Sequence, residues 1–147
     1  MSDTCHAVTV EISPAELLDR ITILRIKLNH QRDSDKKSRI ASELHSFEAA
    51  RSQHVPESPQ LAELVTELSL VNESLWSVED RIRQCRAAAD RDGFVESAET
   101  ILRLNDERSS IKRRINVVLG SLHLEEKRYP ITSAITPIVQ SATLCRS

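Results

Sequence analysis

Apolar residues recur along the chain at spacings of three and four, which is the period of a helix with one buried face. In the first such run, Ser13 suits an N-cap, Pro14 suits the first helical position, and Glu16 completes the pattern of a capping box. We predict that this helix ends in the polar sequence NHQRDSD, residues 29–35. Its apolar positions are Leu17, Ile21, Leu24 and Leu28.

Two further helices follow from the same pattern. One is predicted from Asp35 to His54 and carries Ile40, Leu44 and Phe47 on a single face. The sequence VPESP ends it, and the last serine and proline of that sequence suit the start of a third helix. This third helix has the longest apolar seam, at Leu61, Leu64, Leu68, Val71, Leu75, Val78, Ile82, Cys85 and Ala89.

The sequence DRDG, residues 90–93, predicts a tight turn between the third helix and a fourth. Gly120 predicts the end of the fourth helix, because glycine readily adopts the left-handed conformation of a C′ residue. Spacings that alternate between three and four over several heptads are typical of coiled coils, so these two helices should form a long antiparallel hairpin. The apolar seam of the fourth helix is interrupted by an arginine and consists of Ile101, Leu104, Arg108, Ile111, Ile115 and Val118.

These elements predict an all-α fold, a partly open, antiparallel up-and-down bundle of four helices built on the coiled-coil-like hairpin. The two shorter N-terminal helices can cover only part of the hairpin, and we expect them at the end away from the DRDG turn. VTVEI, residues 8–12, and the sequence after Tyr129 lack a helical period and are predicted to be extended. We therefore predict one domain over residues 1–129 and an extended or flexible tail over 130–147. The low aromatic content of 3% and the presence of only two glycines argue against a β-sandwich or barrel.

Composition narrows the classes of function. The formal net charge is −2, and the basic residues 112–114 have no stacking aromatic residue beside them, so nucleic-acid binding is not predicted. No apolar run is long enough to span a membrane, and the N-terminus has no signal-peptide pattern. The cysteines Cys5, Cys85 and Cys145 are odd in number and far apart, which predicts reduced thiols and a cytoplasmic location.

The sequence predicts neither a metal site nor a cofactor. The pairs His45–Glu48 and His123–Glu126 have a spacing that would put two ligands on one helix face, yet neither pair has a third ligand near it in the sequence. No glycine-rich phosphate loop and no pattern for a serine or cysteine nucleophile occurs in the chain.

The most unusual chemistry lies in NESLWSVEDRIR, residues 72–83, which holds the only tryptophan of the chain. If the turn centres near residues 91–93, a polar row on the third helix meets a polar row on the fourth, and the two rows would still meet if the register slipped by one helical turn, about four residues. Three pairs then face each other, namely Asn72 with Lys112, Trp76 with Arg108, and Glu79 with Asn105, and Arg83 and Asn116 extend the two rows.

Arg108 falls on the apolar seam itself, so we expect protein groups to hold it. It can stack on Trp76 while its guanidinium reaches Glu79, with the charged groups within about 4 Å. Burying such a pair costs desolvation energy, and apolar replacements are often equally stable. The network therefore indicates either a functional site or a device that fixes helix register, as a buried asparagine does in coiled coils.

Several motifs, taken together, resemble those of a protein family. The stretches SPAELLDRITILRIK, NESLWSVEDRIR, LNDERSSIKRRIN and LGSLHLEEKRY occur in this order within residues 8–129. They are similar to the motifs SPGELIDKITIL, NxxLWxxEDxIR, NDxRxxxKxxIN and ExKxY of short, uncharacterised, all-helical bacterial proteins. Members of that family often accompany genes for glycosyltransferases and surface-polysaccharide assembly. The chain departs from the pattern at Ala15, where glycine is usual, and after Tyr129.

The resemblance implies no established activity, but its motif residues overlap with the polar rows found from helical spacing. The motif positions are Glu16, Asp19 and Lys27 in the first helix, Asn72, Trp76, Glu79, Asp80 and Arg83 in the third, Asn105, Asp106, Arg108, Lys112 and Asn116 in the fourth, and Glu126, Lys127 and Tyr129 after it. All of these except Asp80, Asp106 and Glu126 are candidate ligand-binding residues.

The leading hypothesis is a cytoplasmic binding or accessory protein whose polar groove holds a small anionic ligand or an acidic segment of a partner. Arg83, Arg108 and Lys112 would supply charge-assisted donors, and the resemblance implies a role in surface-polysaccharide biosynthesis. The alternative is an enzyme for an anionic, sugar-type substrate, with Glu79 or Glu16 as general base and Arg108 or Lys112 stabilising negative charge. A third hypothesis is a structural hairpin that forms a homodimer.

Overall fold

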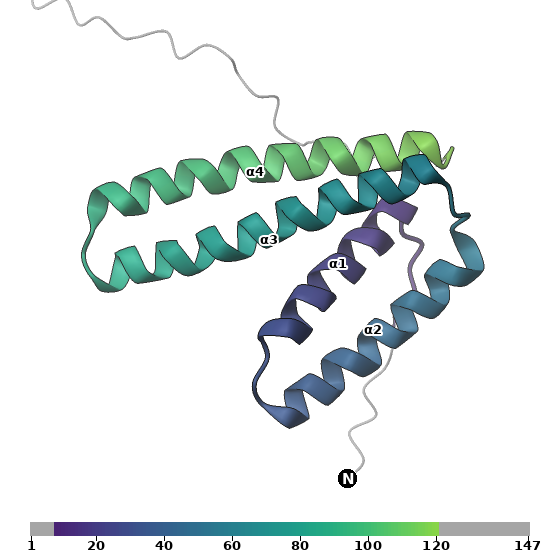
Figure 1. Cartoon of the computed structure of the whole chain (residues 1–147), viewed down its shortest axis with the longest axis horizontal. Helices are drawn as coiled ribbons and strands as arrows, with labels where there is room; N and C mark the ends of the chain where they lie inside the picture. Colours follow the sequence, from purple (N-terminus) through teal and green to yellow (C-terminus); the bar gives the residue numbers. More distant parts are fainter. Residues whose placement is uncertain (1–7, 121–147) are drawn as a thin grey trace, which may run out of the picture.

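The computed structural model describes residues 8–120 of the chain. Within this range the chain forms four helices and no strand. The helices are α1 (Pro14–His30), α2 (Ser34–His54), α3 (Pro59–Ala87) and α4 (Arg91–Val118) (Figure 1). The predicted all-α class and the order of the four helices are confirmed. The predicted tail, residues 130–147, lies outside the described residues.

Local capping explains where three of the helices begin or end. The Oγ atom of Ser13 accepts a hydrogen bond from the backbone N–H of Glu16 at 3.2 Å, and Ser58 does the same for Leu61 at 3.1 Å. Each cap satisfies an N–H group that has no partner within its helix. Gly120 follows α4 with a φ of +63°, which confirms its predicted place as a C′ residue.

The four helices form two antiparallel hairpins of unequal length. The α3–α4 hairpin is long, and the α1–α2 hairpin lies against the end of it that is farther from its turn, as predicted (Figure 1). Within the α1–α2 hairpin, only α1 packs against the long hairpin. It packs against α2, α3 and α4, whereas α2 packs against α1 alone. The bundle is therefore more open than four helices packed side by side.

The core lies where α1 meets the long hairpin. Its largest fully buried apolar side chains come from α1, α3 and α4 and are Leu18, Ile21, Leu61, Leu68 and Ile115. Each such side chain contributes roughly 1.5–3 kcal/mol by leaving water. Toward the turn of the long hairpin the seam residues Val78 and Ile82 are only half-buried, because no third helix covers that part of the seam.

The turn between α3 and α4 differs from the prediction. It occupies residues 88–90, because Asp90 is the N-cap of α4 and accepts a hydrogen bond from the backbone N–H of Gly93 at 3.0 Å. The backbone N–H of Asp90 donates to the carbonyl of Cys85 at 2.9 Å, and that of Ala89 donates to the carbonyl of Arg86 at 3.3 Å. These two bonds form a Schellman motif with Ala89 in the left-handed region, at a φ of 54°.

The predicted turn was misplaced because Gly93 was assigned to it. Gly93 instead lies in the first turn of α4, where its lack of a side chain allows close packing. A Cβ atom on Gly93 would collide with the capping carboxylate of Asp90 and would lie 2.9 Å from the Sγ atom of Cys85. The residue that does adopt a positive φ is an alanine, and alanine carries no sequence signal for that conformation. The connection between α3 and α4 therefore lies earlier in the sequence than predicted, by about the length of one turn of helix.

We expect Ala89→Gly to stabilise the protein by about 1 kcal/mol, because glycine removes the steric cost of a left-handed alanine. Equilibrium unfolding in urea would measure the change. Ala88→Gly is the matched control, since Ala88 has a φ of −87° and gains no relief from glycine. Stabilisation of both variants, or of neither, would contradict the assignment of strain to Ala89.

Candidate functional site

The register of the long hairpin follows from the shifted turn. Asn72 Nδ2 and Arg108 Nε both donate to the same oxygen of Asp19, at 2.9 and 3.0 Å. Arg108 therefore lies across from Asn72, whereas the predicted register put Trp76 there. The polar rows of α3 and α4 do meet, one helical turn away from the predicted register.

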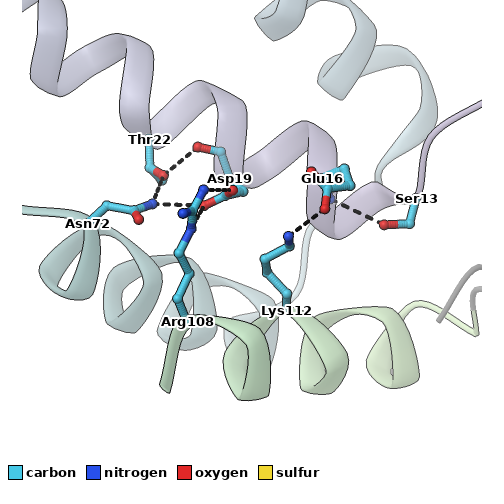
Figure 2. A network of polar contacts seen from close by, with 7 residues as sticks. All are labelled: Ser13, Glu16, Asp19, Thr22, Asn72, Arg108 and Lys112. Carbon is cyan, nitrogen blue, oxygen red and sulfur yellow. Dashed lines mark hydrogen bonds and ion pairs between the residues drawn. The ribbon is translucent and has the colours of Figure 1, made fainter. Parts of the chain in front are cut away.

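The centre of the site is the carboxylate of Asp19 on α1, whose side chain is 4% exposed. It accepts one hydrogen bond from Asn72 on α3 and two from the guanidinium of Arg108 on α4. Thr22 completes the cluster: its hydroxyl donates to the backbone carbonyl of Asp19 at 2.7 Å and accepts from Asn72 at 2.8 Å (Figure 2). A buried carboxylate is tolerated when charge-assisted donors of this kind compensate its lost hydration.

A second set of contacts joins the start of α1 to α4. The ammonium group of Lys112, whose side chain is 7% exposed, donates to the carboxylate of Glu16 (Figure 2). Asn116, one turn farther along α4, accepts a hydrogen bond from the backbone N–H of Ala15 at 3.1 Å. Glu16 thus serves an ion pair between helices and does not close the predicted capping box, although Ser13 makes its half of that motif.

The predicted ion pair between Glu79 and Arg108 is wrong. The guanidinium pairs with Asp19, and Glu79 is exposed. The physical reason is that α1 brings a carboxylate into the interior, where it cannot be hydrated, while Glu79 stays in contact with water. The ring contact of Trp76 is with His30, at 5.0 Å between ring centroids and an interplanar angle of 39°.

Glu79 and Arg108 nevertheless line one cavity, of about 130 Å³, between α1, α3 and α4. Lys27 and Trp76 also line it, together with Asn72 and the apolar residues Ile23, Ile26 and Leu75. The Nε1 atom of Trp76 is buried and has no hydrogen-bond acceptor within residues 8–120. Burying a polar N–H group without an acceptor is unfavourable, and such groups are rare in folded proteins.

The remaining predicted residues do not join this site. Arg83 is exposed and pairs with Asp80 on its own helix at 2.6 Å. Asn105 is exposed and donates to the carbonyl of Ile101 at 3.0 Å, also on its own helix. Lys127 and Tyr129 lie outside the described residues. The site therefore unites Glu16, Asp19, Lys27, Asn72, Trp76, Glu79, Arg108, Lys112 and Asn116.

Sequence reasoning missed Thr22 and His30. Thr22 follows Asp19 by three residues, so the two share a face of α1 that also carries apolar core residues. Two polar residues on that face were the available signal for a buried cluster. His30 carries no comparable signal, because its contact with Trp76 depends on how α1 crosses α3.

The described part of the chain shows neither a metal-binding cluster nor a membrane-spanning helix. Residues 8–120 contain no group of three or more histidine, cysteine, aspartate or glutamate side chains placed to hold a metal ion. None of the helices in this range combines the length and the apolar character that crossing a membrane requires.

Removing the carboxylate of Asp19 should destabilise the protein strongly, because Asn72 and Arg108 would lose the buried acceptor that they share. We expect Asp19→Ala to cost about 3–5 kcal/mol in the free energy of unfolding, and Asp19→Asn to cost less because the amide keeps the shape and one acceptor. Glu79→Ala, which removes an exposed carboxylate, should change stability by less than about 0.5 kcal/mol. Urea unfolding of the three variants tests this order, and equal costs for Asp19→Ala and Glu79→Ala would refute it.

Comparison with known proteins places the chain in a family but gives no activity. No curated protein matches it, and no solved structure does. A match to one protein family extends over residues 8–144, which is most of the chain and includes every described residue. The chain therefore belongs to DUF6165, a family of unknown function.

Proposed function

We propose that this protein binds a small anionic ligand in the cavity lined by Lys27, Trp76, Glu79 and Arg108. The observation that carries the proposal is the pair of cations that line this cavity, the exposed Lys27 and the guanidinium of Arg108, which Asp19 holds in place. The Nε1–H group of Trp76 is buried without an acceptor in the described chain, which costs about 1–3 kcal/mol. A ligand oxygen that reached this group through a small movement of the indole ring would remove that cost.

The cations around the cavity support an acidic ligand. Lys27 is exposed, and no carboxylate within residues 8–120 lies in ion-pair distance of its ammonium group. Arg108 is held in place by Asp19, so its guanidinium does not have to be ordered when a ligand arrives. A cation that is fixed before binding loses less entropy than a mobile one. The pair of Asp19 and Arg108 then has a purpose beyond stability, namely to hold a charge at the cavity wall.

The size of the cavity limits the acidic part of the ligand. A volume of about 130 Å³ suits a single phosphate or carboxylate group rather than a folded partner segment. The resemblance to proteins encoded beside glycosyltransferase genes supports including sugar acids and sugar nucleotides among the ligands tested. We also propose a cytoplasmic location, which is consistent with the free thiol of Cys85 in the interior.

Binding can be followed directly, because Trp76 is the only tryptophan of the chain. Titration of the full chain with inorganic phosphate, glucuronate and a uridine diphosphate sugar should change the tryptophan fluorescence and release or absorb heat in calorimetry. An absence of both signals with all three compounds at millimolar concentrations would end the proposal.

Two charge variants should shift the affinity in opposite directions. Lys27→Gln should weaken binding of an anion, and Glu79→Gln should strengthen it, because the carboxylate of Glu79 repels the ligand. Each change should alter Kd by roughly three- to tenfold, since two unit charges a few ångströms apart in a hydrated site interact with about 1 kcal/mol.

Lys36→Gln and Glu73→Gln are matched controls, because both residues are exposed and neither lines the cavity. They should leave Kd unchanged. If Glu79→Gln weakened binding as much as Lys27→Gln, the bound group would not be an anion held at this position.

A further inference from the structure

A second cavity, of about 270 Å³, lies beside Trp76. Lys27 and Trp76 line both cavities, and the second one is completed by His30, Gln31 and Ile40. The two cavities therefore adjoin along the side chains of Lys27 and Trp76. A molecule larger than a single acidic group could occupy both.

The polar groups of the second cavity include an acceptor and donors in defined states. Nδ1 of His30 lies 2.9 Å from the carbonyl oxygen of Ile26, which can only accept, so Nδ1 carries the proton. In the neutral imidazole, Nε2 is then an acceptor. Oε1 of Gln31 accepts from the backbone N–H groups of Arg32 and Asp33, both at 3.0 Å, so the amide NH₂ group of Gln31 is oriented as a donor.

Trp76, His30 and Ile40 supply the aromatic and aliphatic part of the lining of the second cavity. The indole ring of Trp76 and the imidazole ring of His30 lie 5.0 Å apart, and Ile40 from α2 is half-buried against the core. Aromatic faces bind the apolar face of a ring, while acceptors and donors at the rim bind polar substituents around it. Lys27, shared with the first cavity, adds a cationic donor between the two.

We infer that the ligand has two parts, an anionic group in the cavity beside Arg108 and a neutral ring bearing hydroxyl groups in the cavity beside His30. This inference rests on the proposed function, because it assigns the second part of the same ligand. A hydroxyl group both donates and accepts, and so matches Nε2 of His30 and the NH₂ group of Gln31 together. A purely apolar ring would leave both groups unpaired.

Three phosphate compounds separate the contributions of the two cavities. Inorganic phosphate probes the anionic part alone, phenyl phosphate adds a ring without hydroxyl groups, and glucose 1-phosphate adds a hydroxylated ring. With the full chain, we expect phenyl phosphate to bind more tightly than phosphate, and glucose 1-phosphate to bind about tenfold more tightly than phenyl phosphate, because at least one further hydrogen bond forms. Tryptophan fluorescence and calorimetry would give the dissociation constants.

A variant of His30 tests the assigned acceptor. His30→Phe keeps a ring against Trp76 but removes Nε2, so it should reduce the affinity for glucose 1-phosphate to that for phenyl phosphate and leave phosphate binding unchanged. His45→Phe, at an exposed position of α2, is the control and should change none of the three constants.

The outcomes distinguish the two proposals. If none of the three compounds binds, the proposed anion site fails and this inference fails with it. If phosphate binds but glucose 1-phosphate binds no more tightly than phenyl phosphate, the anion site stands and the two-part ligand is refuted. This comparison uses the unaltered chain, so it decides the question even if His30→Phe does not fold.

Discussion

The arrangement of the two hairpins depends on the carboxylate of Asp19, a charge placed on the inward face of α1. A buried carboxylate is stable only if hydrogen-bond donors replace its hydration. Those donors come from two other helices, Asn72 on α3 and Arg108 on α4. A shift of α1 by one turn along the hairpin would leave the carboxylate and the guanidinium apart. Apolar contacts have little directional preference, whereas the hydrogen bonds of this cluster require one arrangement of the three helices.

The polar contacts between α1 and α4 also fix the direction of α1. Ala15 contacts Asn116, Glu16 contacts Lys112, and Asp19 contacts Arg108, so rising numbers on α1 meet falling numbers on α4. This order makes α1 antiparallel to α4. Apolar burial supplies most of the favourable free energy, and the ordered ladder of polar contacts selects the orientation. The hypothesis of a register-fixing role, raised from the sequence, and that of a binding site are therefore compatible.

The helices and most of their ends could be predicted, because the relevant signals are local. Ser13, Ser58 and Gly120 act through bonds to residues a few positions away, and the seams follow the helical period. The turn could not be placed, since Ala89 adopts a positive φ without a sequence signal and Gly93 resembles a turn residue while serving close packing. An error of one helical turn then passed into every predicted contact across the hairpin.

The ion-pair partner of Arg108 could not be predicted from the sequence, for a different reason. The short turn brings α3 and α4 together, so the predicted contacts joined these two helices, whereas Asp19 is separated from Arg108 by 89 positions along the sequence. Nothing in the hairpin pattern shows where a third helix will cross it. What could be recognised was the set of polar residues on inward faces, and most of that set is indeed united in the site.

The cavities have a geometric origin in the unequal hairpins. Because α2 packs only against α1, the α1–α2 hairpin is not held along the full length of α3 (Figure 1). At the far end of α1 the two hairpins diverge (Figure 1), and the rings of Trp76 and His30 meet between them without filling the space. Toward the other end, the polar ladder keeps α1 close to α4. The packing of α1 across the long hairpin therefore has two effects. Near the start of α1 its polar contacts hold Arg108 in place, and near the end of α1 it leaves a cavity beside Arg108. A protein that only needed stability could replace the cluster by apolar side chains and close the interval.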